Sequence, residues 1–211
     1  MKPLLTFYGD DFTGSTAVME VLSFAGVSTM LFLEPPELDV LKEYPTLQAI
    51  GVAGIARSKD PAWMKSNLPS VFKRLKKFGA PVSHYKVCST FDSSPEIGSI
   101  GVATEIGDAI FSTDWVPLVV GAPDIQRYQA FGTLFAKSGA SIHRLDRHPV
   151  MSRHPVTPMN EADLTRHLTR QTNLKIGIIS LAEIKAGQSH EAVSKCLSDG
   201  ARILAIDVVD D

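Results

Sequence analysis

Cysteine is scarce in this sequence, which contains only Cys88 and Cys196. Two cysteines cannot form a disulfide framework, and they lack the paired spacing of a zinc site. Long hydrophobic runs are also missing, since the longest uncharged stretch, residues 21–33, is too short to span a bilayer. Asp10 and Asp11 interrupt the N-terminus before a signal-peptide core could form. These absences predict a reduced, soluble, cytoplasmic protein with no membrane partner.

An excess of positive charge is absent as well, because 21 lysine and arginine residues stand against 23 aspartate and glutamate residues. A nucleic-acid partner requires a basic face, so the composition predicts no nucleic-acid binding. His143, His148 and His154 match no standard metal spacing, and we predict no metal site among them. The remaining composition, with 44% hydrophobic and 21% charged residues, is typical of a globular domain.

Short apolar or β-branched runs alternate with helical patterns along the chain. This alternation is typical of a mainly parallel sheet flanked by helices, and it predicts a Rossmann-like, three-layer α/β fold. The predicted strands share a β-branched, apolar character and cover residues 4–8, 29–33, 49–53, 82–87, 116–120, 176–179 and 203–208. The segment 126–158 does not alternate cleanly and contains three prolines, so we expect an irregular excursion from the sheet there.

Three helical patterns carry specific expectations. An apolar stripe after the first predicted strand predicts a helix that Gly26 ends. The segment 60–78 repeats the helical spacing, and we expect Pro69 to divide it into two pieces. Asn160 resembles the N-cap of a further helix over residues 161–171.

Polar clusters follow four of the predicted strands, at residues 9–14, 54–58, 86–93 and 121–128. Ligands of open α/β sheets bind beyond the carboxyl ends of the strands. If all four strands are parallel, the four clusters share one edge of the sheet. The sequence therefore predicts a ligand site at that edge.

The first cluster contains two adjacent carboxylates, Asp10 and Asp11. They could be simple turn and cap residues, but a pair exceeds what one helix cap needs, and Gly14 would let a ligand approach the backbone. Asp11 could then act as a base or orient a hydroxyl, and either carboxylate could contact Mg²⁺. Arg57 and Arg127 could be surface residues, yet in a crevice their guanidinium groups suit a carboxylate.

The third cluster is rich in small hydroxyl groups. Ser89 and Thr90 lie between Lys86 and Asp92, and further serines follow. Such a segment could be an ordinary hydrophilic loop. The number of hydroxyls beside a lysine and an aspartate favours a polyol or an oxyanion as ligand.

Three motifs resemble those of a known family. Asp10-Asp11-Phe12-Thr13-Gly14 resembles the Asp-Asp-Leu/Phe-Thr-Gly motif of the four-carbon acid sugar kinase family. The run from Tyr85 to Ser93, Tyr-Lys-Val-Cys-Ser-Thr-Phe-Asp-Ser, is similar to the second motif of that family, particularly in its 3-oxotetronate kinase branch. The run His-Pro-Val-Thr-Pro-Met at residues 154–159 resembles a third landmark. The motifs follow the family order and span most of the chain.

The resemblance implies that this chain is part of a two-domain, ATP-dependent kinase that phosphorylates sugar acids such as threonate, erythronate or a 3-oxotetronate. Residues 1–211 would form the N-terminal domain that binds the sugar acid. ATP and Mg²⁺ would be bound mostly by a C-terminal nucleotide-binding domain that this chain lacks, and the chain alone would then be inactive. The chain ends just after its last predicted strand, as this expectation requires. The sequence is compatible with a homodimer but does not determine the oligomeric state.

The resemblance and the residue chemistry together suggest roles. Asp11 would be the catalytic base or orient the reacting hydroxyl, and Asp10 would support it or bind Mg²⁺. The proposed substrate-binding residues share polar or charged side chains in the four clusters: Asp10, Asp11, Arg57, Lys86, Ser89, Thr90, Asp92 and Arg127.

The second motif departs from the commonest family pattern. Cys88 stands where many members have aspartate, and Phe91-Asp92 stands where they have Leu-Arg. The missing arginine leaves Arg57 or Lys86 as replacements for binding the substrate carboxylate.

Two alternative functions follow from the same residues. A stand-alone module could bind a sugar acid without catalysis. A receiver-like signalling domain would need an aspartate after the third strand, where this sequence has Gly54-Ile55-Ala56-Arg57, and this difference argues against that class.

Overall fold

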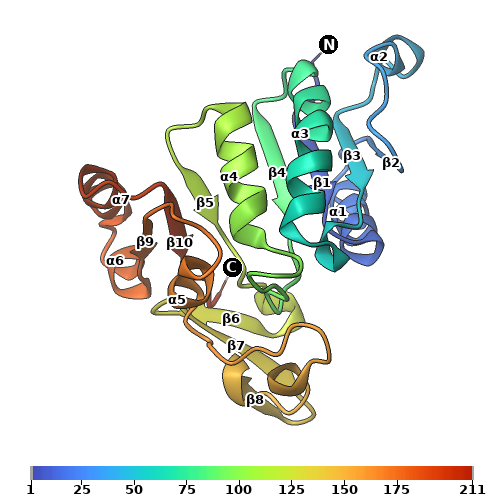
Figure 1. Cartoon of the computed structure of the whole chain (residues 1–211). Helices are drawn as coiled ribbons and strands as arrows, with labels where there is room; N and C mark the ends of the chain where they lie inside the picture. The colour runs from blue at the N-terminus through green and yellow to red at the C-terminus, as the bar shows by residue number, and fades with distance from the viewer. Residues whose placement is uncertain (1, 211) are drawn as a thin grey trace. The chain divides into compact units, whose positions relative to one another are not determined.

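The structure is a computed structural model that describes residues 2–210. The chain forms two compact units, shown in Figure 1. Unit 1 contains the residues up to Cys88 together with Glu96–Ser112, and unit 2 contains Ser89–Pro95 and the residues from Thr113 onward. Each unit has its own sheet and helices, and each is described separately.

Unit 1 is built on a four-stranded parallel sheet with the strand order β2-β3-β1-β4. Its strands are β1 (Leu5–Gly9), β2 (Thr29–Phe32), β3 (Ala49–Ala53) and β4 (Val82–Lys86). In the register of the sheet, Gly9 at the end of β1 lies opposite both Ala53 and Lys86. The three strands therefore end at the same level, and the residues that follow them share one edge.

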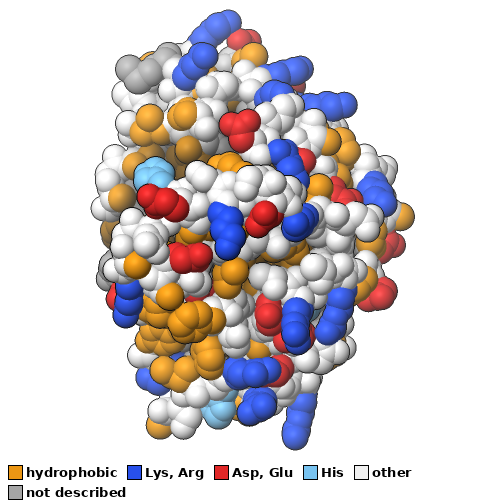
Figure 2. All heavy atoms as spheres, turned by 90° about the vertical axis from the view of Figure 1, so that its left-hand side faces the viewer, with side chains coloured by type: hydrophobic (Ala, Val, Ile, Leu, Met, Phe, Trp, Pro, Cys, Tyr) orange, Lys and Arg blue, Asp and Glu red, His pale blue; other side chains and the backbone are white. Residues whose placement is uncertain are grey.

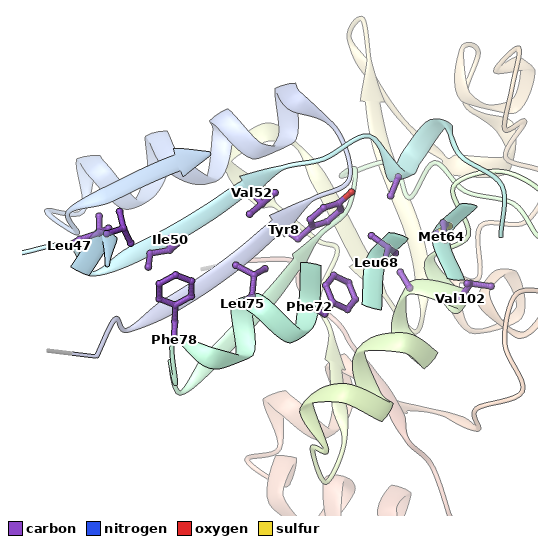
Figure 3. Packing of buried hydrophobic residues seen from close by; sticks show 13 residues of the cluster. Tyr8, Leu47, Ile50, Val52, Met64, Leu68, Phe72, Leu75, Phe78 and Val102 are labelled. Carbon is purple, nitrogen blue, oxygen red and sulfur yellow. The ribbon is translucent and has the colours of Figure 1, made fainter. Parts of the chain in front are cut away.

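Helices cover both faces of this sheet. The helices are α1 (Phe12–Phe24), α2 (Val40–Glu43), α3 (Pro61–Lys77) and α4 (Ile100–Phe111), and η1 (Ala56–Ser58) is a 3₁₀ turn. Helix α1 lies on one face, and α3 and α4 lie on the other (Figures 1 and 3). Phe72 and Leu75 of α3 pack against Tyr8 and Ile50 of the sheet, as Figure 3 shows. This arrangement confirms the predicted three-layer α/β fold.

Unit 2 has a second, separate parallel sheet with the order β5-β10-β9. Its strands are β5 (Val116–Leu118), β9 (Ile176–Ile179) and β10 (Ile203–Ile206), and its helices are α5 (Leu164–Thr169), α6 (Leu181–Lys185) and α7 (Ser189–Ser198). The expectation of one shared edge is therefore wrong for the fourth cluster. That cluster follows β5, which belongs to a different sheet from β1, β3 and β4.

The segment 126–158 leaves the parallel sheets, but its first half is more regular than we predicted. Strands β6 (Arg127–Ala130), β7 (Thr133–Ser138) and β8 (Ser141–Arg144) form an antiparallel sheet. Short 3₁₀ turns precede and follow it: η2 (Pro123–Ile125), η3 (Leu145–Arg147) and η4 (Met151–Arg153).

The hairpin turns explain why this sheet escaped prediction. Phe131 and Gly132 connect β6 to β7 with φ angles of 50° and 73°. Two successive positive φ angles are the signature of a type I′ hairpin turn, which sequences usually mark with Asn-Gly. A phenylalanine in that position gives no such signal, because non-glycine residues seldom adopt this conformation.

Two helix predictions need correction. Helix α3 runs without interruption through Pro69, because Leu68 and Phe72 on either side of the proline are buried in one core. Helix α5 begins at Leu164 and its N-cap is Asp163, not Asn160, since the Asp163 carboxylate accepts hydrogen bonds from the backbone of Thr165 and Arg166.

The surface reflects the balanced composition. On the face shown in Figure 2, acidic and basic side chains are interspersed rather than gathered by sign. Among the helices formed by residues 2–210, none has the length and hydrophobicity needed to cross a membrane.

Replacing Pro69 by alanine should stabilise unit 1. A proline inside a helix removes one backbone hydrogen bond and crowds the preceding turn, which costs about 3 kcal/mol. Part of that gain is offset because proline also restricts the unfolded chain. We expect Pro69→Ala to raise the free energy of unfolding by about 1–2 kcal/mol in urea titrations.

The exposed Ser66 on the same helix provides the control, and Ser66→Ala should change stability by less than about 0.5 kcal/mol. A loss of stability in Pro69→Ala would show that the proline ring contributes packing that outweighs its backbone cost.

Candidate functional site

Asp10 is a buried carboxylate directly after the inner strand β1, and its side chain is paired with Arg57. Asp10 is only 1% exposed. Arg57 donates from Nη2 to Oδ1 at 2.6 Å and from Nε to Oδ2 at 3.2 Å. The backbone N–H of Arg57 also donates to the Asp10 carbonyl at 2.9 Å. The turn η1 is thus fixed to the carboxyl end of β1 by both backbone and side-chain bonds.

Asp11 is the N-cap of α1 and shares the same arginine. Its Oδ1 accepts the backbone N–H of Gly14 at 2.7 Å, and its Oδ2 accepts Arg57 Nη1 at 2.5 Å. The Asp11 side chain remains 28% exposed. Of the two adjacent carboxylates, Asp11 is therefore the one that a ligand can reach.

The electrostatics of this cluster depend on Arg57. Burial raises the pKa of the Asp10 carboxyl above its ordinary value, and the hydrogen bonds and charge of Arg57 oppose this rise. Burial alone would lower the pKa of Arg57, but its hydrogen bonds to Asp10 and the charges of both aspartates raise it overall. Removing one partner of such a buried pair typically costs about 3–5 kcal/mol, so Arg57 is required for the local structure.

Lys86 lies at the same edge, at the end of β4. Its backbone carbonyl accepts the N–H of Asp10 at 3.1 Å, and its Nζ donates to the carbonyl of Val87. A Cβ atom at Gly14 would lie 2.6 Å from Asp11 Oδ1, 3.6 Å from Arg57 Nη2 and 3.7 Å from Lys86 Cγ. The glycine is needed for this close approach. The structure therefore brings together four predicted residues: Asp10, Asp11, Arg57 and Lys86.

The other predicted residues belong to unit 2. In the loop Ser89–Pro95, the Thr90 hydroxyl donates to Asp92 Oδ1 at 2.8 Å, and both side chains are buried. Ser89 is half-buried. Phe91 between them is fully buried with a φ angle of 57°, a strained conformation for a bulky residue.

A buried network that the sequence did not reveal anchors this loop. The Ser93 hydroxyl lies 3.0 Å from His167 Nε2 and accepts from Gln171 Nε2 at 2.9 Å. His167 Nε2 also lies 3.1 Å from the Ser93 carbonyl oxygen, and the imidazole contacts the Phe91 ring edge-on at 5.6 Å between centroids. These contacts hold the strained loop in place. In the sequence, His167 lies within a helical pattern, and nothing in that pattern marks it as part of a buried network.

Arg127 opens β6 in unit 2. Its Nη1 donates to the backbone carbonyls of Ile125 and Gln126 at 3.1 and 3.2 Å, which fixes the guanidinium over the turn η2.

The histidines after β8 stabilise turns. His148 Nδ1 accepts the backbone N–H groups of Val150 and Met151, and His154 Nδ1 accepts that of Thr157. Within the described residues, no group of three or more His, Cys, Asp or Glu side chains is arranged to hold a metal ion.

His167 should make stability depend on pH. Burial lowers its pKa from 6.5 to about 4 in the folded chain. Between these values the unfolded chain takes up a proton that the folded chain does not, so stability falls as the pH drops from about 6.5 to 4, by up to about 3 kcal/mol. In urea titrations across this range, His167→Gln should show a smaller pH slope than the original chain.

The exposed His190 provides the matched control, and His190→Gln should keep the original slope. An unchanged slope in His167→Gln would mean that His167 titrates alike in both states.

Sequence relatives align with this chain over nearly its full length. It is 49% identical over 208 residues to a protein of Paraburkholderia graminis named 3-oxo-isoapionate kinase, covering 99% of this chain and 44% of that protein. It is 29% identical over 212 residues to the 3-oxo-tetronate kinase of Cupriavidus necator, covering all of this chain and 48% of that protein. The chain thus spans about half the length of the curated relatives it matches.

Solved structures share the fold. A Haemophilus influenzae protein superposes with a TM-score of 0.84 at 28% identity, covering 97% of this chain and 48% of that one. A Salmonella typhimurium protein reaches a TM-score of 0.86 at 24% identity, covering 100% of this chain and 48% of that one, and it supports the fold alone. The model of the family described as "Sugar-binding N-terminal domain" matches residues 5–211. The chain therefore belongs to the family of sugar-binding N-terminal domains.

Proposed function

We propose that this chain is the sugar-acid-binding part of an ATP-dependent kinase that phosphorylates a 3-oxo sugar acid. The names of the relatives support this assignment, and the 49% identity makes 3-oxo-isoapionate the first substrate to test, beside 3-oxotetronate, threonate and erythronate. The observation that carries it is the cluster of Asp10, Asp11 and Arg57 at the carboxyl edge of the unit 1 sheet. Ligands of α/β folds bind at such edges.

Asp11 is the proposed catalytic residue of this cluster. Phosphoryl transfer depends mainly on positioning the attacking hydroxyl and on neutralising charge. The partly exposed Asp11 carboxylate could accept a hydrogen bond from a sugar hydroxyl and take its proton as the bond to phosphorus forms. Arg57 and the backbone N–H of Gly14 hold this carboxylate in one orientation.

The geometry changes the role that we propose for Arg57. Asp10 and Asp11 both accept hydrogen bonds from the guanidinium group of Arg57. Binding a substrate carboxylate there would therefore require breaking a buried ion pair. We therefore assign Arg57 to positioning of the two aspartates. Lys86 is instead a candidate for nearby phosphate oxygens, because its ammonium has three donors, one of which bonds the Val87 carbonyl.

The proposed cofactors are ATP and Mg²⁺, bound mostly by a C-terminal ATP-binding domain as partner. When bound, Mg²⁺ neutralises the phosphate charge that develops during transfer. Asp10 is a poor fit for the ion, because both of its carboxylate oxygens accept from Arg57. Asp11 fits better, since its side chain is partly exposed and each of its oxygens, which accepts one hydrogen bond, retains a lone pair for the ion or its water.

In unit 2 we keep Ser89, Thr90, Asp92 and Arg127 as proposed contacts for the sugar acid. Thr90 and Asp92 are bonded to each other and would mainly shape the loop. The half-buried Ser89 hydroxyl is the group best able to contact a ligand hydroxyl directly.

A thermal-shift titration tests the proposed function. A ligand at about one hundred times its dissociation constant adds roughly 2.7 kcal/mol of stability, which should raise the unfolding midpoint by several degrees. We expect 3-oxo-isoapionate, 3-oxotetronate, threonate or erythronate to give this shift, and MgATP alone to give much less.

If none of the four acids shifts the midpoint in this chain or in a protein that joins it to an ATP-binding half, the proposed function is wrong. A shift in the chain together with no kinase activity in the joined protein would favour a sugar-acid-binding module without catalysis.

Asp11→Asn separates the charge of Asp11 from its capping role. Asparagine caps a helix about as well as aspartate, so the fold should be retained. In a protein that joins this chain to an ATP-binding half, we expect kcat to fall about 10²- to 10⁴-fold with sugar-acid affinity changed much less.

Asp60 is a matched control, because it is the N-cap of α3 and accepts the backbone N–H of Trp63 at 2.7 Å. Asp60→Asn should leave kcat unchanged. Near-normal turnover in Asp11→Asn would rule out its role as the base.

A further inference from the structure

Three buried polar atoms on β6 lack hydrogen-bond partners. Within residues 2–210, neither the amide nitrogen nor the amide oxygen of Gln129 is hydrogen-bonded, and the Nε of Arg127 is likewise unpaired. Gln129 has no exposed surface at all. Buried polar groups in native proteins are nearly always satisfied, so a fully unpaired amide requires an explanation.

The two side chains lie on the same face of their strand. Residues two apart in a strand point to the same side, which places Arg127 beside Gln129. The residues opposite them on β7 are Ala136 and Leu134, both fully buried. These apolar neighbours cannot satisfy an amide or a guanidinium. A leucine at position 129 would suit this surface better than glutamine does.

The position of this pair in unit 2 is that of a ligand site. The backbone of Gln129 exchanges hydrogen bonds of 2.8 and 2.9 Å with Val208, two residues beyond the central strand β10. Asp207 binds the N–H of Gly132 in the turn that follows β6. A Cβ atom at Gly121, after β5, would lie 2.7 Å from the Cβ of Val208. Strand β6 therefore crosses the carboxyl edge of the second parallel sheet, where α/β folds bind ligands.

The free atoms define the chemistry of the ligand. Arg127 Nε and Gln129 Nε2 are donors, and Gln129 Oε1 is an acceptor. A carboxylate can accept from both donors while a neighbouring hydroxyl donates to the amide oxygen. This is the pattern of a hydroxy acid.

We propose that Gln129, together with Arg127 Nε, binds the carboxylate and an adjacent hydroxyl of the sugar acid. The proposal rests on the proposed function, because it adds a specificity residue to a sugar-acid-binding domain. The acid has to displace the atoms that cover the amide, and its hydrogen bonds are then shielded from water, where they are strongest.

The test compares Gln129→Leu with the original chain by isothermal titration calorimetry. The ligands are the sugar acid that gives the largest thermal shift and erythritol, a four-carbon polyol without a carboxylate. Loss of the amide should weaken binding of the acid about 10- to 100-fold and reduce the preference for the acid over erythritol. The unfolding midpoint should stay the same or rise, because an unpaired buried amide is removed.

Two further variants sharpen the comparison. Gln129→Glu keeps the shape but places a carboxylate against that of the ligand, so it should weaken acid binding at least as much as leucine does. Gln188 is exposed and has no capping hydrogen bond from its side chain, so Gln188→Leu should change neither affinity nor midpoint.

The outcomes separate this proposal from the proposed function. Unchanged acid affinity in Gln129→Leu would overturn the proposal and point to an internal water on the amide. A midpoint lowered by several degrees would also overturn it, because the amide would then stabilise the fold. If the acids bind neither to the original chain nor to a protein that joins it to an ATP-binding half, the proposed function fails, and this proposal fails with it.

Discussion

The local structure at both parallel sheets depends on a buried carboxylate placed directly after an inner strand. Asp10 follows β1 and Asp207 follows β10, and both are nearly inaccessible to solvent. A buried carboxylate is costly unless it is fully hydrogen-bonded. Arg57 compensates Asp10. For Asp207 the compensation comes from three backbone N–H groups, contributed by Phe131, Gly132 and Leu181. In each unit, the path of the chain beyond the sheet is set by these bonds.

The different partners of Asp10 and Asp207 give the two sites different chemical properties. Asp207 is surrounded by backbone donors that hold the β6–β7 turn against the start of α6, and this arrangement fixes structure without presenting a reactive group. Asp10 is held by a side chain that reaches further, to Asp11 at the N-terminus of α1. The positive end of that helix and the shared guanidinium favour a negative charge at a point that remains open to ligands. This difference places the proposed chemistry of unit 1 at Asp11.

Much of the fold could be predicted from local patterns. The strands Ala49–Ala53 and Ile176–Ile179 match the predicted bounds, because compact β-branched runs between turn residues are a strong signal. The division into two parallel sheets could not be predicted, because strand pairing depends on contacts between segments that are far apart in the sequence. The rule that ligands bind at carboxyl edges correctly grouped Asp10, Arg57 and Lys86, whose neighbours are fixed by the sheet register. His167 and Gln129 were missed because only the tertiary fold shows what surrounds them.

The unpaired amide of Gln129 supports a ligand site because it contrasts with polar groups that are hydrogen-bonded elsewhere in unit 2. Elsewhere in unit 2 a polar side chain in a turn is well bonded, since the Nδ1 of His148 accepts two backbone N–H groups; besides the β6 atoms, the Nδ1 of His167 is the one buried side-chain atom without a partner within residues 2–210. A buried amide left without partners costs about 1–3 kcal/mol for each group, which is a sizeable part of the stability of a domain. Selection for stability alone would replace such a residue with an apolar one of similar size. A costly amide beside an arginine at a carboxyl edge is therefore better explained by a ligand than by the fold.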